Sequence, residues 1–180
     1  GKGYVTNGPS YCTIIGSANI DIGGTPEEAL REGDSNSGKA MQSLGGAGRN
    51  VAHNLRLLGV GVKLITAIGA DVNARSIIES CEALGIDITN SLKTSSEATP
   101  ISLYIADEKG NIKFSVSDMR IYDKLTIKFI SSKMELINKS RMVILDTNIP
   151  AGTIQYLCEK CRTPIFASAE SRKRAEKLLL

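Results

Sequence analysis

Residues 45–71, GGAGRNVAHNLRLLGVGVKLITAIGAD, combine a glycine loop, a helix and a strand in that order. The three glycines among the first four residues leave no side chain in the way, so the backbone can approach a ligand closely. Apolar residues then recur at helical spacing up to Gly59, where a left-handed cap would fall, which predicts a helix over residues 50–58. The first N–H groups of that helix point toward whatever lies beside the glycines. Residues 62–68 are apolar and partly β-branched, which predicts a strand.

The composition limits the class of protein. The chain has 180 residues, of which 42% are apolar and 23% charged, as expected for a globular chain of one domain or most of one. Its net charge of +3 is too small to indicate a nucleic-acid surface, and no apolar run approaches the roughly 20 residues of a membrane span. Nothing at the start resembles a signal peptide, so we expect a cytoplasmic protein without membrane or nucleic-acid partners. The cysteines do not suggest a disulfide framework, and we expect Cys12, Cys81 and Cys158 in the core.

Strand and helix patterns alternate along the rest of the chain. Residues 101–105 and 112–116 alternate apolar and polar side chains on either side of a turn, which predicts a β-hairpin whose polar face stands off the main body. The other predicted elements are strands at 12–15, 142–145 and 165–167, a short strand from Ile86, and helices at 73–84, 126–137 (with Ile127 facing inward) and 151–161. Such alternation indicates a parallel sheet with right-handed crossovers, so the predicted fold class is α/β.

The glycine stretch also resembles a family signature. Gly-Gly-x-Gly-x-Asn at 45–50, Leu-Gly at 58–59 and Gly-x-Asp at 69–71 together resemble the first signature of the ribokinase-like (phosphofructokinase-B type) sugar and nucleoside kinases. Within that family the chain is most similar to the pseudouridine kinases, because SANID at 17–21 and GDSN at 33–36 precede the glycines and Arg49 lies among them.

The resemblance implies a fold and a domain organisation. The expected fold is a ribokinase-like three-layer α/β/α arrangement with a mainly parallel sheet and a small β lid, whose segments lie near residues 33–44 and 98–118. Residues 11–180 would be the N-terminal part of the kinase domain, with its C-terminal part missing, and residues 1–10 a linker or the remnant of an upstream module. We expect the lid hairpin to pair with a strand at 37–43 and to offer a face for a homodimer, because a small sheet has edges and an apolar face to cover.

The resemblance also implies a reaction. ATP would donate its γ-phosphoryl group to a hydroxymethyl oxygen of a sugar or nucleoside, the 5′ oxygen in pseudouridine, with Mg²⁺ present and a lid that closes over the substrate. The second family signature, Asp-Thr-x-Gly-Ala-Gly-Asp, does not occur in the sequence, and residues 166–170 lack the Asp-Pro of the family. We therefore expect a substrate-binding fragment that is inactive alone, with the catalytic Asp and the ATP and Mg²⁺ sites beyond residue 180.

A pocket that selects a polyol needs several fixed hydrogen-bonding groups, because a competitor that lacks one hydroxyl is rejected by leaving a buried polar group unpaired. Polar residues that follow strands or open helices collect at the carboxyl edge of a parallel sheet. The predicted substrate-binding residues are Asn19, Asp21, Asn36, Gly45, Gly46, Asn50 and Asn148, together with Asp118, which resembles the Asp of an Asp-Met pair in the family. The resemblance places Asn36 on the lid, facing the sugar.

Several of these features have other interpretations. Asp21 could be a turn residue after a strand, and Asn50 could simply begin its helix. Residues 33–40 match the phosphate-binding loop G-x-x-x-x-G-K-[ST] except at the last position, but no hydrophobic strand leads into them and no helix is predicted after them. Residues 46–51 lack the third glycine of the dinucleotide fingerprint, which disfavours a Rossmann dehydrogenase.

Metal sites are also disfavoured by the sequence. Cys158 and Cys161 have the spacing of metal ligands, but no second pair follows, so we expect them to pack in the core. His53 is the single histidine, which excludes a site with several histidines, and we expect it on a helix surface. The alternative to a kinase is a non-catalytic sugar- or nucleoside-binding or sensing module of the same fold.

Overall fold

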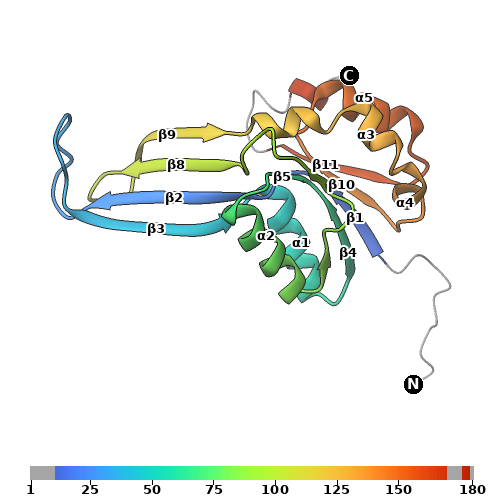
Figure 1. Cartoon of the computed structure of the whole chain (residues 1–180), viewed down its shortest axis with the longest axis horizontal. Coiled ribbons are helices and arrows are strands. Elements are labelled where there is room, and N and C mark those ends of the chain that lie inside the picture. The colour runs from blue at the N-terminus through green and yellow to red at the C-terminus, as the bar shows by residue number, and fades with distance from the viewer. Residues whose placement is uncertain (1–10, 170–175, 179–180) are drawn as a thin grey trace.

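The computed structural model describes residues 11–169 and 176–178, which form a body and a sheet that projects from it (Figure 1). The predicted linker at residues 1–10 lies outside the described residues. A five-stranded sheet in the order β11-β10-β1-β4-β6 lies at the centre of the body. Its strands are β1 (Tyr11–Ile15), β4 (Gly61–Ile65), β6 (Ile86–Asp87), β10 (Val143–Asp146) and β11 (Ile165–Ser168). All of its pairings are parallel, as the alternation of strands and helices predicts.

Helices cover both faces of this sheet (Figure 1). One face packs on α1 (Ala47–Leu57) and α2 (Val72–Ala83), and the other on α3 (Ile127–Ser131), α4 (Met134–Asn138) and α5 (Ala151–Lys160). Neighbouring strand residues such as Ile14 and Ile15 are fully buried in different clusters, since successive side chains point to opposite faces. The body therefore has the predicted three layers.

The projecting sheet has four strands in the order β3-β2-β8-β9. They are β2 (Asn19–Pro26), β3 (Gly38–Gly45), β8 (Ile101–Ala106) and β9 (Ile112–Asp118). The hairpin predicted from alternation is confirmed as β8 and β9. The prediction that this hairpin pairs with the strand near residues 37–43 is wrong, because β2 lies between β8 and β3 and pairs with both.

Other departures from the predicted elements have local causes. The apolar run at residues 62–68 is divided between β4 and the short β5 (Ala67–Ile68), which pairs with β7 (Leu92–Lys93). The predicted helix at residues 126–137 is broken after α3, where the Ser132 hydroxyl donates back to the carbonyl of Phe129 (2.6 Å). Ile127, expected to face inward, is 45% exposed.

The remaining segments complete the connections between the two sheets. The 3₁₀ turn η1 (Arg120–Lys124) follows β9 and leads back into the body, and η2 (Glu176–Leu178) packs beside α5. Tyr122 of η1 is fully buried, and its hydroxyl donates to the carbonyl of Ala18 and accepts from the amide of the same residue, both at 2.8 Å. Tyr122 thereby fixes the short bend through which β1 continues into β2.

Asp71 fixes the second connection between the two sheets. Its Oδ1 accepts from the amide of Ala74 (2.9 Å), which caps α2, and also from the hydroxyl of Thr99 (2.6 Å). Its Oδ2 accepts from the Thr99 amide (2.8 Å), just before β8. Burial alone would raise the pKa of Asp71, but the hydrogen bonds from Thr99 and Ala74 outweigh it and hold the pKa below its usual value.

We predict that Asp71→Ala lowers the free energy of unfolding at pH 7 by about 1–2 kcal/mol, the usual cost of a lost helix cap. Because the native pKa is depressed, this stabilisation is fully present above the unfolded pKa of about 3.9 and is lost as the pH falls through the native pKa. Urea unfolding of wild type and variant between pH 7 and pH 3 would measure the difference. Glu79→Ala, an exposed acid on the same helix, is the control, and an equal effect of both substitutions would contradict the assignment.

Candidate functional site

The carboxyl ends of β1 and β10 and the N-terminus of α1 meet at one edge of the body sheet. Asp146, the last residue of β10, is 2% exposed and joins all three. Its Oδ2 accepts from the amide of Ser17 (2.6 Å), the hydroxyl of Ser17 (2.7 Å) and the amide of Gly48 in the first turn of α1 (3.0 Å). Its Oδ1 accepts from the amide of Asn148 (3.0 Å). The buried charge is thus compensated by donors and by the positive end of a helix.

The Asp146 carboxylate can lie this close to the backbone because residue 16 is a glycine. A Cβ at that position would lie 2.4 Å from Asp146 Oδ2. The side-chain Nδ2 of Asn148, whose backbone amide donates to Asp146, donates to the Ser17 hydroxyl (3.2 Å). Asn148, Ser17 and Asp146 therefore form one hydrogen-bonded group at the exit of the sheet. Lys177 supports the same loop, because its Nζ donates to the carbonyls of Thr147 and Ile149, both at 3.0 Å.

Asn19 and Asp21 lie beside this group, at the start of β2. The Nδ2 of Asn19, which is 4% exposed, donates to Asp21 Oδ1 (2.6 Å) and orients the carboxylate. Asn19 pairs with Gly45 across the sheet, and a Cβ at Gly45 would lie only 2.0 Å from Asp21 Oδ2. The half-buried carboxylate of Asp21 therefore lies directly over the Gly45 backbone.

Gly46 makes the turn from β3 into α1 with φ of 97°, a conformation that favours glycine. A Cβ there would lie 2.5 Å from the carbonyl oxygen of Ser17, so the position is closed to larger residues in two ways. The amide of Arg49 donates to the same Ser17 carbonyl (2.9 Å), and Asn50 follows in the first turn with an exposed side chain. The helix begins at Ala47, three residues earlier than the predicted 50–58, so Asn50 does not begin it.

The structure gathers six of the eight predicted site residues at this edge. They are Asn19, Asp21, Gly45, Gly46, Asn50 and Asn148. Asp118 lies at the same end of the projecting sheet but two strands from β2, since Ile101 pairs with both Ile20 and Asp118. Arg120 donates to both Asp118 oxygens (2.9 and 2.7 Å) and holds the pKa of that carboxyl below its usual value.

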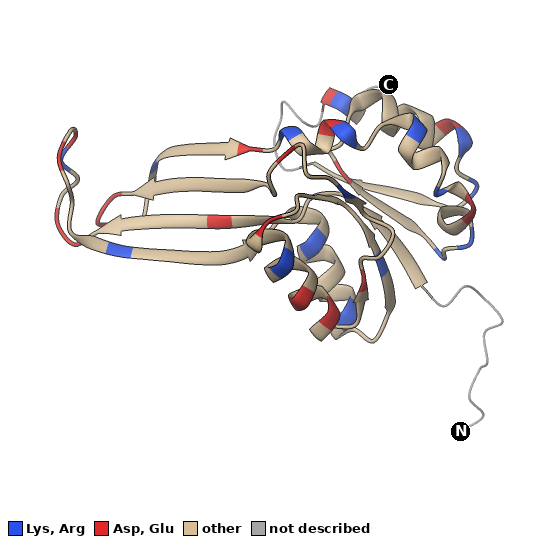
Figure 2. Ribbon diagram, in the orientation of Figure 1, with Lys and Arg blue, Asp and Glu red and all other residues tan. Residues whose placement is uncertain are grey.

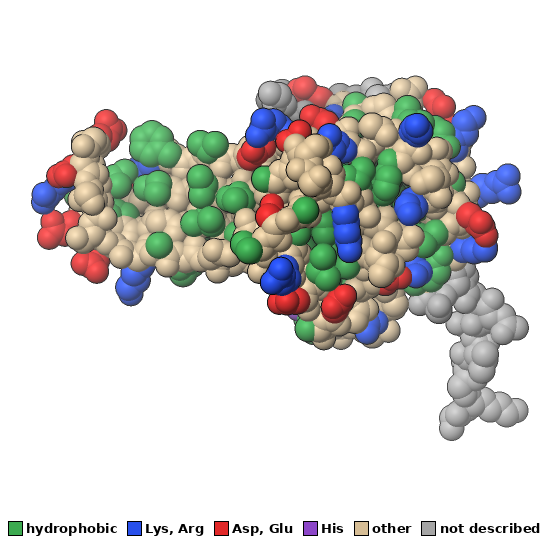
Figure 3. Space-filling view, viewed as in Figure 1, with side chains coloured by type: hydrophobic (Ala, Val, Ile, Leu, Met, Phe, Trp, Pro, Cys, Tyr) green, Lys and Arg blue, Asp and Glu red, His purple; other side chains and the backbone are tan. Residues whose placement is uncertain are grey.

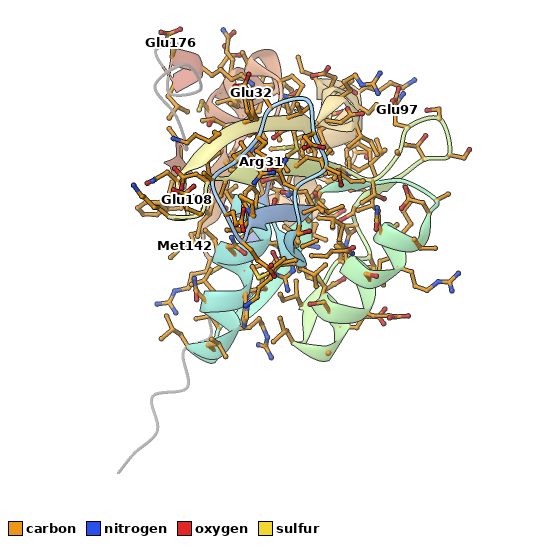
Figure 4. The ribbon with its side chains drawn as sticks, turned by 90° about the vertical axis from the view of Figure 1, so that its left-hand side faces the viewer. Arg31, Glu32, Glu97, Glu108, Met142 and Glu176 are labelled. Carbon is orange, nitrogen blue, oxygen red and sulfur yellow. The ribbon has the colours of Figure 1, made fainter. Side chains whose placement is uncertain are left out.

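Asn36 does not share this cluster. The pairing of β2 with β3 runs from Asn19 and Gly45 to Pro26 and Gly38, about 23 Å at the usual rise of a strand. Asn36 lies beyond that far end, where it accepts from the amide of Arg31 (2.8 Å) and holds the tip loop together. Figure 4 looks onto this tip, with Arg31 and Glu32 on the loop between β2 and β3. Asn36 thus lies at the tip of the projecting sheet, away from Asp21, and its predicted contact with the sugar stays a prediction.

A cavity of about 620 Å³ also lies at the tip, lined by apolar groups such as Leu30, Ile105 and Phe114 and by charged and polar residues of the tip loop. Recognition of a polyol needs polar groups held in fixed positions, and the carboxyl edge supplies them as the hydrogen-bonded groups around Asp21 and Asp146. We therefore place the candidate site at the edge.

The alternatives considered from the sequence are resolved by the described residues. Gly38 and Lys39 open β3 and no helix follows them, so residues 33–40 are not a phosphate-binding loop. Cys158 is exposed and Cys161 half-buried, so the prediction that Cys158 lies in the core is wrong, whereas Cys12 and Cys81 are buried as expected. Among the described residues, no three His, Cys, Asp or Glu side chains gather where a metal ion could bind.

Charged residues of both signs are mixed over the body. Figure 2 shows Lys and Arg interspersed with Asp and Glu over the helices of the body. No helix in the described part of the chain is long and apolar enough to cross a membrane.

Sequence reasoning missed Asp146, Ser17 and Tyr122. The sequence does contain a signal for Asp146, since this residue directly follows the strand predicted at 142–145 and precedes Asn148 by two residues. Tyr122 carried none, because its partner Ala18 is 104 residues away and the contact depends on the tertiary fold.

Comparison with known proteins agrees with this architecture. The family model described as pfkB family carbohydrate kinase matches residues 9–179. Pseudouridine kinase of Escherichia coli is 31% identical over 169 residues, which cover 93% of this chain and 54% of that protein. Ribokinase of Bacillus subtilis is 26% identical over 153 residues, covering 83% of this chain and 51% of that protein.

Solved structures extend the similarity. A carbohydrate kinase from Agrobacterium tumefaciens superposes with a TM-score of 0.85 at 30% identity, over 94% of this chain and 56% of that one. The chain thus spans about half the length of the relatives that it matches. With the family model matching nearly all of its residues, the chain belongs to the pfkB family of carbohydrate kinases.

Proposed function

We propose that the protein uses ATP and Mg²⁺ to phosphorylate a hydroxymethyl group of a sugar or nucleoside, and that the carboxyl edge described above binds this acceptor. The observation that carries the proposal is the Asp21 carboxylate, which Asn19 orients (2.6 Å) over the bare backbone of Gly45. A fixed carboxylate accepts hydrogen bonds from sugar hydroxyls, and the glycines let the ring approach the backbone. Family membership supports the reaction type, and a relative named pseudouridine kinase supports pseudouridine as one substrate.

Each residue of the site has a proposed part in binding. Asp21 accepts from substrate hydroxyls, and Asn50 and Asn148 donate to or accept from the remaining ones. The amides of Gly48 and Arg49 in the first turn of α1 already donate to Asp146 Oδ2 and to the Ser17 carbonyl, so this turn acts by holding the backbone of the site in place. ATP would supply the phosphoryl group, and Mg²⁺ would neutralise its charge. Catalysis of this transfer depends mainly on holding the reacting groups in position. A cytoplasmic location, where ATP is available, belongs to the same proposal.

We predict that Asp21→Ala in the intact protein raises the KM for the sugar or abolishes turnover while the fold survives. Loss of one or two hydrogen bonds to a charged group, each about 1.5–3 kcal/mol, corresponds to at least a tenfold fall in kcat/KM. Steady-state kinetics with ATP, Mg²⁺ and ribose or pseudouridine would measure it. Unchanged kinetics would remove Asp21 from the site, and retained binding without any turnover in wild type would favour the non-catalytic binding module instead.

Gly45→Ala provides a second variant for the same experiment. Its methyl group would lie 2.0 Å from Asp21 Oδ2 and displace that carboxylate, so we expect the kinetic defect of Asp21→Ala. Gly152→Ala on α5 is the matched control, because a Cβ there meets nothing within 4 Å. Circular dichroism of each variant would show that the fold is retained.

We also propose that the projecting sheet acts as a lid and that its outer face binds a second copy of the chain. Ile22, Leu103 and Val116 lie side by side on neighbouring strands, on one face of the sheet. Ile105 and Phe114 are paired two residues further along and lie on the same face. Four of these side chains are exposed to solvent, by 47% (Leu103), 68% (Val116), 42% (Ile105) and 56% (Phe114). Green side chains accordingly gather along the projecting sheet in Figure 3. Such a patch, with few charges, can pack against its own symmetry mate as two stacked sheets do.

We predict that the protein sediments as a dimer at concentrations of tens of micromolar and that Phe114→Asp combined with Val116→Asp converts it to a monomer. The introduced charges would have to be buried without partners in the interface. Val72→Asp is the control, because Val72 is 72% exposed on α2, outside the projecting sheet. A monomeric wild-type protein at high concentration would contradict the dimer and leave the lid proposal intact.

A further inference from the structure

The inner face of the projecting sheet carries polar groups beyond those of the site described above. Strand register places Asp21 beside Ser43 on β3 and Ser102 on β8, and Ser102 beside Ser117 on β9. These four side chains share the face that Asp21 occupies over Gly45. The polar side chains therefore extend from Asp21 across the sheet to β9.

Ser102 and Ser117 form a pair at the end of this row. Their hydroxyl oxygens are 2.9 Å apart, and either one can be the donor. Once one hydroxyl has donated to the other, the pair still offers one O–H donor and free lone pairs to a ligand. It can thus donate to and accept from the same neutral group, as the edge of an amide or imide requires.

Tyr104 forms an aromatic surface in the next row. A Cβ at Gly23 would lie 2.1 Å from the Cζ atom of Tyr104, so the ring crosses β2 and lies on the bare backbone of Gly23. Gly23 pairs with Tyr104 in register and follows Asp21 by two residues, about 7 Å along the strand. A half-buried tyrosine ring therefore lies beside the carboxylate, on the same inner face.

The spacing separates these groups from the sugar-binding residues. Neighbouring strands are about 4.8 Å apart, so Ser117 lies about 10 Å across the sheet from β2. A sugar ring bonded to Asp21 over Gly45 cannot itself reach that far. Only a substituent on the ring can contact Ser117 and Tyr104 together.

We propose that Ser102, Ser117 and Tyr104 form a subsite for a nucleobase, so that the acceptor is a nucleoside with an uncharged lactam or imide edge. The inference rests on the proposed function, because Asp21 must hold the sugar for the base to reach the subsite. The serine pair bonds the donor and acceptor groups of the base edge, and the Tyr104 ring packs against the base. The outer face of the same sheet carries Leu103 and Val116 in the row where the inner face carries the serine pair and Tyr104, and it takes no part in this subsite.

The test is the discrimination between a nucleoside and a free sugar. In the intact protein we expect Ser102→Ala combined with Ser117→Ala to lower kcat/KM for pseudouridine or uridine roughly tenfold, as for two neutral hydrogen bonds, and to leave kcat/KM for ribose unchanged. Tyr104→Leu should act in the same direction, whereas Tyr104→Phe, which keeps the ring, should have a smaller effect. Ser37→Ala is the control, since Ser37 is exposed in the tip loop, outside the strands.

The outcomes separate this inference from the proposed function. An equal loss for nucleoside and ribose, or no loss for either, would overturn the subsite while the kinase proposal stands. If wild type binds the nucleoside without phosphorylating it, the kinase proposal fails, and calorimetric affinities for nucleoside and ribose give the same discrimination test. Binding of ribose but of neither nucleoside by wild type would overturn the subsite directly.

Discussion

The buried carboxylate of Asp146 is the interaction on which the site depends. It accepts three hydrogen bonds at Oδ2, from Ser17 and Gly48, and one at Oδ1 from Asn148. A buried charge is tolerated only when donors surround it, and two of these donors, Gly48 and Ser17, precede Asp146 by 98 and 129 residues in the sequence. Removal of the carboxylate would leave several buried donors unpaired at once, at a cost of about 1–3 kcal/mol each. One side chain therefore holds the glycine loop, the first turn of α1 and Asn148 in their positions.

The two sheets have different parts in the proposed function. The body sheet is buried on both faces and holds the α1 N-terminus and Asp146 in place, which gives a rigid floor. The projecting sheet supplies Asp21 from β2 and is attached to the body through the bend at Ala18, held by Tyr122, and through Thr99, held by Asp71. Beside these hydrogen bonds, Ile20 of β2 is buried in the same apolar cluster as α1 and α2, and Ile101 of β8 packs against it. The near end of the sheet, with Asp21 over Gly45, is thus fixed to the body, while the rest of the sheet projects as the proposed lid would.

The parts of the fold that depend on local pattern could be predicted from the sequence. The helix after the glycines, the hairpin of β8 and β9 and the parallel body sheet all follow from spacing and alternation within short segments. The order of strands in the projecting sheet could not, because β2 contains Gly23, Gly24 and Pro26, which weaken a strand pattern, and its two partners lie in distant segments. The break after α3 escaped prediction because no proline or glycine marks it. The exposure of Cys158 likewise depends on which face of α5 meets the sheet.

The candidate site shows the same division between local and tertiary information. Residues next to strand ends or glycines, such as Asp21 and Asn148, could be found by position alone, whereas the distance of Asn36 from them depends on how far β3 extends. The central claim is that the acceptor binds over Gly45 against Asp21. A crystal structure of the intact protein with pseudouridine and a non-hydrolysable ATP analogue tests it most directly. The account predicts substrate hydroxyls within hydrogen-bond distance of the Asp21 carboxylate, and a nucleoside bound instead in the cavity at the tip, beside Leu30 and Phe114, would contradict it.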